Sequence, residues 1–123
     1  MSEQQHEPTE LISTELERIH QDSYGTGAHR IHTHIVGDRF VLCVVDNHVT
    51  VAERTLLDSG QGEAVKATRM AFQEAIGPTF IAVVERAVGR RVEAFVSHVH
   101  LDPMFTVEMF RLAPLEGEHE ELE

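Results

Sequence analysis

The sequence predicts a single α+β domain, in which helices pack on one face of one mostly antiparallel four-stranded sheet. Apolar residues recur at helical spacing in two segments, residues 9–21 and residues 63–87. Four other runs are typical of β-strands and form two pairs, each joined by a short turn. The resulting order is α-ββ-α-α-ββ. Such an order indicates an antiparallel sheet whose helices lie on one side.

The first helix and the first hairpin follow from apolar periodicity. Glycines in SYGTG end the helix, and the run RIHTHIV at 30–36 then alternates apolar and polar residues. Gly37-Asp38 separates this run from FVLCVV, which predicts a β-hairpin with a tight turn. The apolar positions of the first helix are Leu11, Ile12, Leu16 and Ile19.

A short helix follows the hairpin. Thr50 and Glu53 have the spacing of a capping box, so a helix is expected to start at Val51. The glycines of SGQG at 59–62 end it.

The long helix at 63–87 carries Gly77-Pro78 in its interior, which predicts a kink or a short break. Gly89 is expected to cap its C-terminus. The second strand pair, VEAFVSHV and FTVEMFRL, is separated by the turn LDPM. In the last strand we expect Phe105, Val107 and Met109 to face the core, because they alternate with more polar residues.

Acidic residues are concentrated at the two ends of the chain. The formal net charge is −11, but residues 18–115 hold 11 acidic and 10 basic side chains. We therefore expect disordered acidic tails at residues 1–8 and 114–123, on either side of a folded domain at residues 9–113. A molecule with this negative charge repels phosphates, so no nucleic-acid partner is expected.

Several functional classes are disfavoured by composition. No run of about 18 apolar residues is present, so no membrane insertion is expected. The start MSEQQHEPTE is unlike a secretory signal, and the single Cys43 excludes an internal disulfide, so we expect a cytoplasmic protein. Cys43 lies in an apolar run and is expected to be buried. No catalytic constellation is recognisable, so we predict no catalytic residues.

Two His-x-His motifs are the candidate metal ligands. His32 and His34 share one face of their strand, as do His98 and His100, because side chains two residues apart on a strand point the same way. Four imidazoles suit zinc, and Asp102 could orient one of them. The alternatives are histidines that face solvent or a partner, or a cluster that senses pH. No cofactor other than zinc is expected.

Four stretches carry a resemblance to a known family. They are SYGTGAHRIHTHIVGD, NHVTVAERTLLDSGQGEAVKATR, ERAVGRRVEAFVSHVHLDP and FTVEMFRL. In order and spacing they resemble the small bacterial family named for the MpsC subunit of a sodium-translocating, membrane-potential-generating system. The resemblance covers residues 8–113. Its most specific block is VTVAERTLL with Arg69 downstream. His98 and His100 stand where acidic residues are common in the family.

The resemblance implies a non-enzymatic accessory or regulatory subunit beside a membrane system linked to cation or inorganic-carbon uptake. Its expected partner is a membrane protein. The alternative hypotheses are a metal-binding protein, such as a small zinc enzyme, and a sensor that binds an anion at Arg69 and the 59–62 loop. Arg69 has a second expected role, which is to pair with Glu53 or another acidic neighbour. A homodimer is also expected, because one layer of helices leaves a sheet face or edge to cover.

Overall fold

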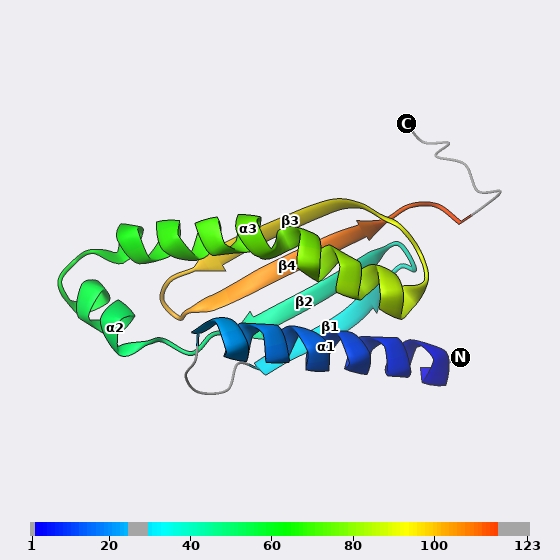
Figure 1. The fold of residues 1–123 in the computed structure, drawn as a ribbon, viewed down its shortest axis with the longest axis horizontal. Helices are drawn as coiled ribbons and strands as arrows, with labels where there is room; N and C mark the ends of the chain where they lie inside the picture. The colour runs from blue at the N-terminus through cyan, green and yellow to red at the C-terminus, as the bar shows by residue number, and fades with distance from the viewer. Residues whose placement is uncertain (1, 25–29, 116–123) are drawn as a thin grey trace.

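The computed structural model describes residues 2–24 and 30–115, and among residues 2–6 it describes the backbone alone (Figure 1). The fold is α+β, with the predicted order α-ββ-α-α-ββ and one antiparallel sheet, so the predicted fold class is confirmed. The elements are α1 (Ser2–Tyr24), β1 (Arg30–Val36), β2 (Phe40–Asp46), α2 (Val51–Asp58), α3 (Gly62–Val88), β3 (Val92–His100) and β4 (Phe105–Leu112).

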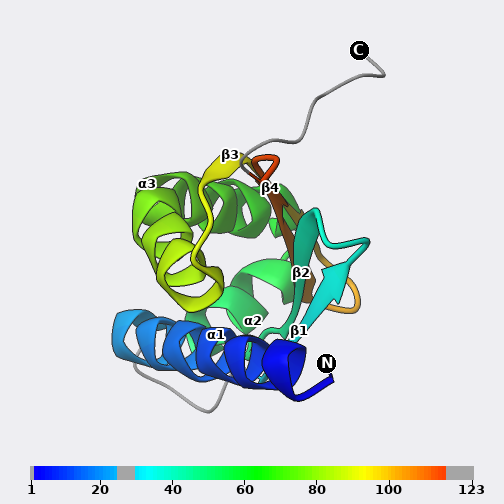
Figure 2. The ribbon, with the colours of Figure 1, turned by 90° about the vertical axis from the view of Figure 1, so that its right-hand side faces the viewer.

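The sheet consists of two hairpins joined side by side. Its strand order is β1-β2-β4-β3, and every neighbouring pair is antiparallel. The central pair, β2 and β4, connects the hairpin β1–β2 to the hairpin β3–β4. Both long helices lie against the same face, with α1 beside β1 and α3 beside β3 (Figure 2). We call this the inner face, and the opposite face the outer face.

α1 starts earlier than expected, and α3 bends where a kink or a short break was expected. α1 begins at Ser2, so residues 2–8, which we expected in the N-terminal tail, are helical. Residue 1 and residues 116–123 lie outside the described part of the chain. α3 continues through Pro78 as one helix, and Figure 1 shows it bending midway along its length. The bend is the expected effect of a proline, which removes one helical hydrogen bond.

Local signals in the sequence explain how the elements begin and end. Thr50 accepts a hydrogen bond from the Glu53 backbone N–H, and the Glu53 side chain accepts one from the Thr50 N–H, so the predicted capping box is present. Gly37 and Asp38, in the turn between β1 and β2, both have a positive φ, near 60°, a conformation that glycine and aspartate adopt more readily than most residues. Gly89 is the left-handed C-cap of α3, with φ 70°.

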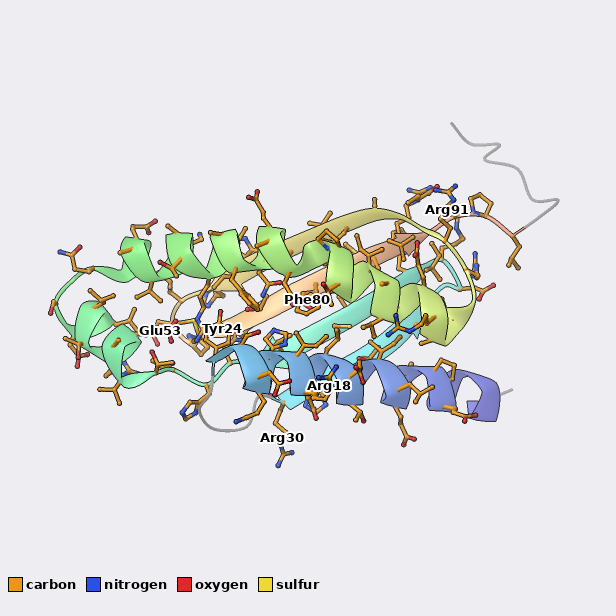
Figure 3. All side chains as sticks on the ribbon, in the orientation of Figure 1. Arg18, Tyr24, Arg30, Glu53, Phe80 and Arg91 are labelled. Carbon is orange, nitrogen blue, oxygen red and sulfur yellow. The ribbon has the colours of Figure 1, made fainter. Side chains whose placement is uncertain are left out.

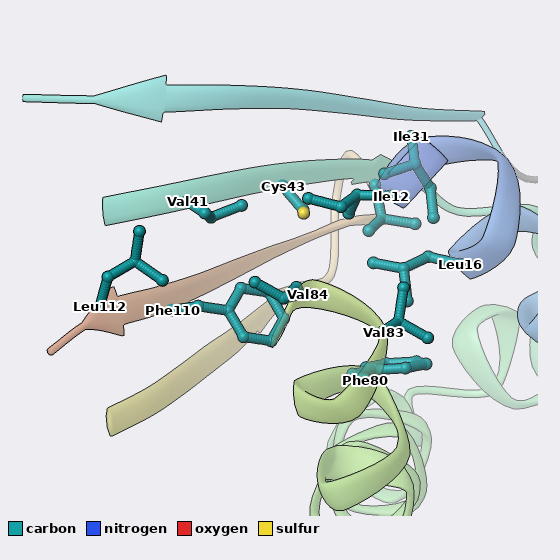
Figure 4. Close-up of a cluster of buried hydrophobic side chains, with 11 residues drawn as sticks. Ile12, Leu16, Ile31, Val41, Cys43, Phe80, Val83, Val84, Phe110 and Leu112 are labelled. Atoms are coloured by element: carbon teal, nitrogen blue, oxygen red, sulfur yellow. The ribbon is translucent and has the colours of Figure 1, made fainter. Parts of the chain in front are cut away.

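The hydrophobic core lies between the inner face and the two long helices (Figure 4). Ile12 and Leu16 of α1 and Phe80 of α3 are fully buried in it. Burying a side chain of this size stabilises the fold by about 1.5–3 kcal/mol. Strand residues complete the core; they include Ile31, Val41, Cys43, Val45, Phe110 and Leu112.

The predicted core face of the last strand is wrong. Thr106, Glu108 and Phe110 face the helices and are buried, so Phe105 and Val107 lie on the outer face. Met109 shares that outer face, because residues two apart on a strand point the same way. The prediction fails because apolar residues follow the outer side of this strand, while a buried carboxyl group occupies its inner side. Alternation alone identifies two faces but does not say which one is covered.

Candidate functional site

An ion pair between the buried Arg69 and the partly buried Glu53 connects α2 to α3. Arg69 Nε donates to Glu53 Oε2 and Arg69 Nη2 donates to Glu53 Oε1, both at 2.7 Å. Arg69 Nη2 also donates to the His48 carbonyl oxygen at 2.9 Å. The planar guanidinium therefore binds the carboxylate through two donors and holds the chain before α2 as well.

Tyr24 completes this contact from the end of α1. The guanidinium carbon of Arg69 lies 4.7 Å from the centre of the Tyr24 ring, a cation–π geometry. Figure 3 shows Tyr24 and Glu53 near one another at the end of the molecule where α2 lies. Residues from α1, α2, α3 and the chain between β2 and α2 thus meet at Arg69, which is only 1% exposed.

The charge state of Glu53 is set by this pairing. Burial alone would raise the pKa of its carboxyl group, but the hydrogen bonds from Arg69 and from the Thr50 N–H outweigh that effect and lower the pKa. Glu53 is therefore ionised at neutral pH, and the predicted pairing with Arg69 is confirmed. The ligand-binding role of Arg69 stays a prediction.

α2 is held firmly, yet it contributes no buried residue to the protein. Val51 is 85% exposed and Leu56 is 38% exposed. A surface pocket lies between α2 and the turn that joins β3 to β4. Its lining mixes charged and apolar side chains; it consists of Val49, Arg54, Leu57, Asp58, Leu101, Asp102, Pro103 and Met104.

Two polar side chains, Glu108 and His20, lie inside the core. The Glu108 side chain is fully buried, and neither of its oxygens makes a hydrogen bond of ordinary geometry with another described residue. Burial raises its pKa to about 8, against a smaller opposing effect of the neighbouring Gln73 amide. His20 Nε2 lies 3.9 Å from Glu108 Oε2, and His20 Nδ1 lies 2.8 Å from the Leu16 carbonyl oxygen.

Glu108 and His20 are therefore both uncharged at neutral pH. Burial lowers the pKa of His20, since the apolar surroundings disfavour the imidazolium ion. The ring also stacks on Phe80, with 5.2 Å between ring centres. The burial of Glu108 and His20 was not predicted from the sequence. The spacing of Ile12, Leu16 and His20, four residues apart, is the signal that places His20 on the buried face of α1.

The four predicted metal ligands share the outer face but lie at its opposite edges. His32 and His34 belong to the edge strand β1, and His98 and His100 belong to the edge strand β3. Two strands separate the pairs, which is roughly 14 Å at about 4.8 Å per strand. Across the described ranges 2–24 and 30–115, no three or more His, Cys, Asp or Glu residues are grouped to hold a metal ion.

Two further sequence predictions concern single residues. Cys43 is buried as expected, and burial raises the pKa of its thiol to about 12, so it is not a thiolate nucleophile near neutral pH. Asp102 lines the surface pocket beside α2.

Comparisons with known proteins identify one family. A search of curated proteins and a search of solved structures each found no match. Within the described residues, no helix is both long and apolar enough to cross a membrane. Residues 4–114 match the family model described as "Na+-translocating membrane potential-generating system (MpsC)". This match spans nearly the whole chain, and we conclude that the chain belongs to the MpsC family.

Proposed function

We propose that this chain is a non-enzymatic, cytosolic accessory or regulatory subunit that binds a membrane-protein component of the transport system after which its family is named. The observation that supports this is α2. The helix is fixed by the Arg69–Glu53 ion pair and a capping box, yet no residue of it is buried. A rigid helix that adds nothing to the core is well suited to contact another protein.

The position of α2 in the sequence supports the same function. The VTVAERTLL block, the most specific part of the family resemblance, forms α2 and its N-cap. Its Glu53 and the downstream Arg69 make the ion pair that orients the helix. The two residues therefore act by positioning the contact surface.

The chemistry of this surface defines the partner segment that fits it. Val51 and Leu56 present apolar side chains to solvent. The adjoining pocket is lined by apolar side chains together with the charged Arg54, Asp58 and Asp102. An interfacial contact of this kind accepts an apolar side chain that is flanked by polar groups. We propose that a cytosolic loop of the membrane component provides it.

Photo-crosslinking in cells that contain the native system tests this proposal. A crosslinking amino acid is placed at Thr55, an exposed position of α2, and the products are identified by mass spectrometry. We expect a product with a protein that has membrane-spanning helices. A Val51→Asp, Leu56→Asp variant should reduce that product at least tenfold, since both apolar contacts are replaced by charges.

The matched control is a crosslinker at Leu11 of α1, which is 56% exposed and is not among the residues that line the pocket beside α2. It should not yield the same product. Circular dichroism and thermal unfolding of the double variant check that the fold is kept. A membrane-protein product that forms equally from both positions, or that survives the double substitution, contradicts a docking role for α2.

A further inference from the structure

The two edges of the sheet differ in how the helices cover them. At the β1 edge the Ile31 N–H donates to Glu17 Oε2 of α1 at 2.9 Å, so α1 occupies part of that edge. The other edge strand, β3, lies next to α3 (Figure 1). Only at its start does α3 bind it through a hydrogen bond among the described residues, from the Val92 N–H to Glu85 Oε2. An edge strand left uncovered can pair with a strand of another molecule.

The hydrogen-bond pattern shows which backbone groups of β3 point to its free edge. The Ala113 N–H donates to the Arg91 carbonyl oxygen, so every second residue of β4, counted back from Ala113, points to β3. The register partners that point back to β4 are Val96, His98 and His100. The residues that alternate with them point to the free edge; they are Phe95, Ser97 and Val99. No described residue binds the N–H or C=O groups of these three residues.

A groove between α3 and β3 follows the same edge. Its β3 side consists of Phe95, Val96 and Ser97. Phe95 and Ser97 lie on the inner face and Val96 lies on the outer face, so a groove that touches all three runs along the edge of the strand. Its α3 side is one stripe of the helix, at helical spacing; it consists of Met70, Glu74, Gly77, Pro78 and Ile81.

The charge of the groove indicates which kind of segment fits it. Glu74 is the charged residue of the lining; it is exposed and forms no ion pair with another described residue. The whole chain carries a formal net charge of −11. A basic segment is therefore attracted to this edge, whereas a second copy of the chain, or its own acidic sequence EGEHEELE, is repelled. Met70 and Ile81, on either side of Glu74 along the helix, provide apolar contacts.

We propose that β3 binds an extended, basic segment of a partner protein as an additional antiparallel strand, with a lysine or arginine beside Glu74 and apolar side chains in the groove on either side of it. The backbone of the segment bonds to the free groups of Phe95, Ser97 and Val99. Side chains two residues apart on a strand point the same way, so the segment has an apolar-x-basic-x-apolar pattern. This inference goes beyond the proposed function, because it concerns a different surface and does not depend on α2.

Nuclear magnetic resonance of the full, nitrogen-15-labelled chain tests the proposal. The probe is the synthetic peptide acetyl-Thr-Leu-Thr-Lys-Thr-Leu-Thr-amide, which has the expected pattern. We expect saturable binding, with the largest shifts at the amides of Phe95, Ser97 and Val99. Hydrogen exchange of these three amides should become slower, because each gains a hydrogen bond.

Backbone methylation of the peptide tests the mode of binding. In an antiparallel pair, the residues whose side chains face α3 are also those whose N–H groups point to β3. Methylation of the leucine and lysine nitrogens should therefore weaken binding by about tenfold or more, since three hydrogen bonds are lost. Methylation of the inner threonine nitrogens is the matched control and should leave binding intact, because those N–H groups point away from β3.

An exchange of charges tests the role of Glu74. Glu74→Lys should weaken binding of the lysine peptide by about fivefold. A peptide with glutamate in place of lysine should bind this variant more tightly than it binds the wild type. Glu74 is exposed, so the fold should be kept. Glu63→Lys, at an exposed position of α3 outside the groove, is the matched control and should keep the preference for the lysine peptide.

Several outcomes overturn the proposal. They are a wild type that does not bind the lysine peptide at millimolar concentration, shifts centred away from β3, equal binding of the two methylated peptides, or an unchanged preference in Glu74→Lys. The protein alone tests the other occupants of the edge. A wild-type dimer that Ser97→Pro converts to a monomer would show a second copy at β3, since this proline removes an edge N–H and no β3–β4 hydrogen bond. Changes in the β3 amide signals on removal of residues 116–123 would show that the chain's own end binds there. Each result would contradict a partner segment, and we expect neither.

Discussion

Arg69 and Glu53 show how one buried residue can determine the position of an exposed element. The ion pair is worth little net stability if both charges are replaced together by apolar groups. Removing only one partner is different, since it leaves an uncompensated charge inside the protein. The pair therefore acts mainly as a positional constraint on α2, and its loss should be visible in stability and in the proposed partner contact.

Arg69→Ala should lower the free energy of unfolding by about 1–3 kcal/mol, because the partly buried Glu53 carboxylate loses its charged partner. Arg69→Lys should recover only part of this loss, since an ammonium group cannot bind both carboxylate oxygens as the guanidinium does. Urea denaturation monitored by circular dichroism gives both values. Two variants with the same stability as the wild type would show that the pair is not a structural constraint.

Glu108 makes the stability of the protein dependent on pH. Its pKa is about 8 in the folded chain against an ordinary value of 4.5, so the folded state binds more protons than the unfolded state between these values. The free energy of unfolding therefore falls as pH rises through this window, by up to about 1.4 kcal/mol per pH unit from this group. The titratable groups around it, His20, Cys43 and Tyr24, stay uncharged near neutral pH because burial disfavours their ions.

Glu108→Gln removes the titrating group and keeps the shape of the side chain. The variant should be more stable than the wild type at pH 8.5, with a difference that shrinks toward pH 5. Thermal unfolding measured across this range gives the two curves. Parallel curves would mean that Glu108 does not titrate as its burial implies.

Cys43 should be unreactive in the folded protein. Its thiol is fully buried and its pKa is raised to about 12, so almost no thiolate is present near neutral pH. Labelling with a thiol reagent at pH 8 should be at least a hundredfold slower in buffer than in denaturant. Comparable rates would place the thiol at the surface.

At the scale of the elements, α3 depends on a close approach to β3. A Cβ atom at Gly77 would lie 3.3 Å from Phe95 Cε2, closer than an ordinary van der Waals contact. Gly77→Val should therefore destabilise the protein by about 1–3 kcal/mol, as overpacked cores commonly do. Phe95→Leu in the same chain should restore part of the loss, because the smaller side chain makes room. Chemical denaturation of the single and double variants measures this coupling, and strictly additive effects would contradict it.

The sequence predicts the elements better than the faces they present. The capping box at Thr50, the turn at Gly37-Asp38 and the cap at Gly89 are local, and each was predictable because a few neighbouring residues determine it. Which face of β4 is the inner one was not predictable from the sequence, because Glu108 is buried only through packing with α1 and α3. The sequence predicted that Arg69 could pair with Glu53. It could not predict the two hydrogen bonds of this pair, because they depend on how α2 packs against α3.

At the scale of the whole molecule, both long helices pack on the inner face of the sheet, and within the described residues neither of them covers the outer face. Both His-x-His motifs were recognisable from the sequence, and each was expected to present its two imidazoles on one face of its own strand. The separation of the two motifs at opposite edges of the sheet was not recognisable, because it depends on the strand order β1-β2-β4-β3. The alignment of residues in rows across the sheet depends on long-range register that no local pattern gives. This is why the candidate metal ligands could be predicted from the sequence and their arrangement could not.

The strand order also has a consequence for how the chain folds. Each hairpin closes a short stretch of sequence, whereas the central pair joins residues 40–46 to residues 105–111 across both α2 and α3. Loop-closure entropy makes such a distant contact slow to form, while hairpins form within microseconds. The two hairpins should therefore appear first as separate units, and the β2–β4 contact should set the folding rate. Pulse-labelling hydrogen exchange would then show protection inside each hairpin before protection between β2 and β4.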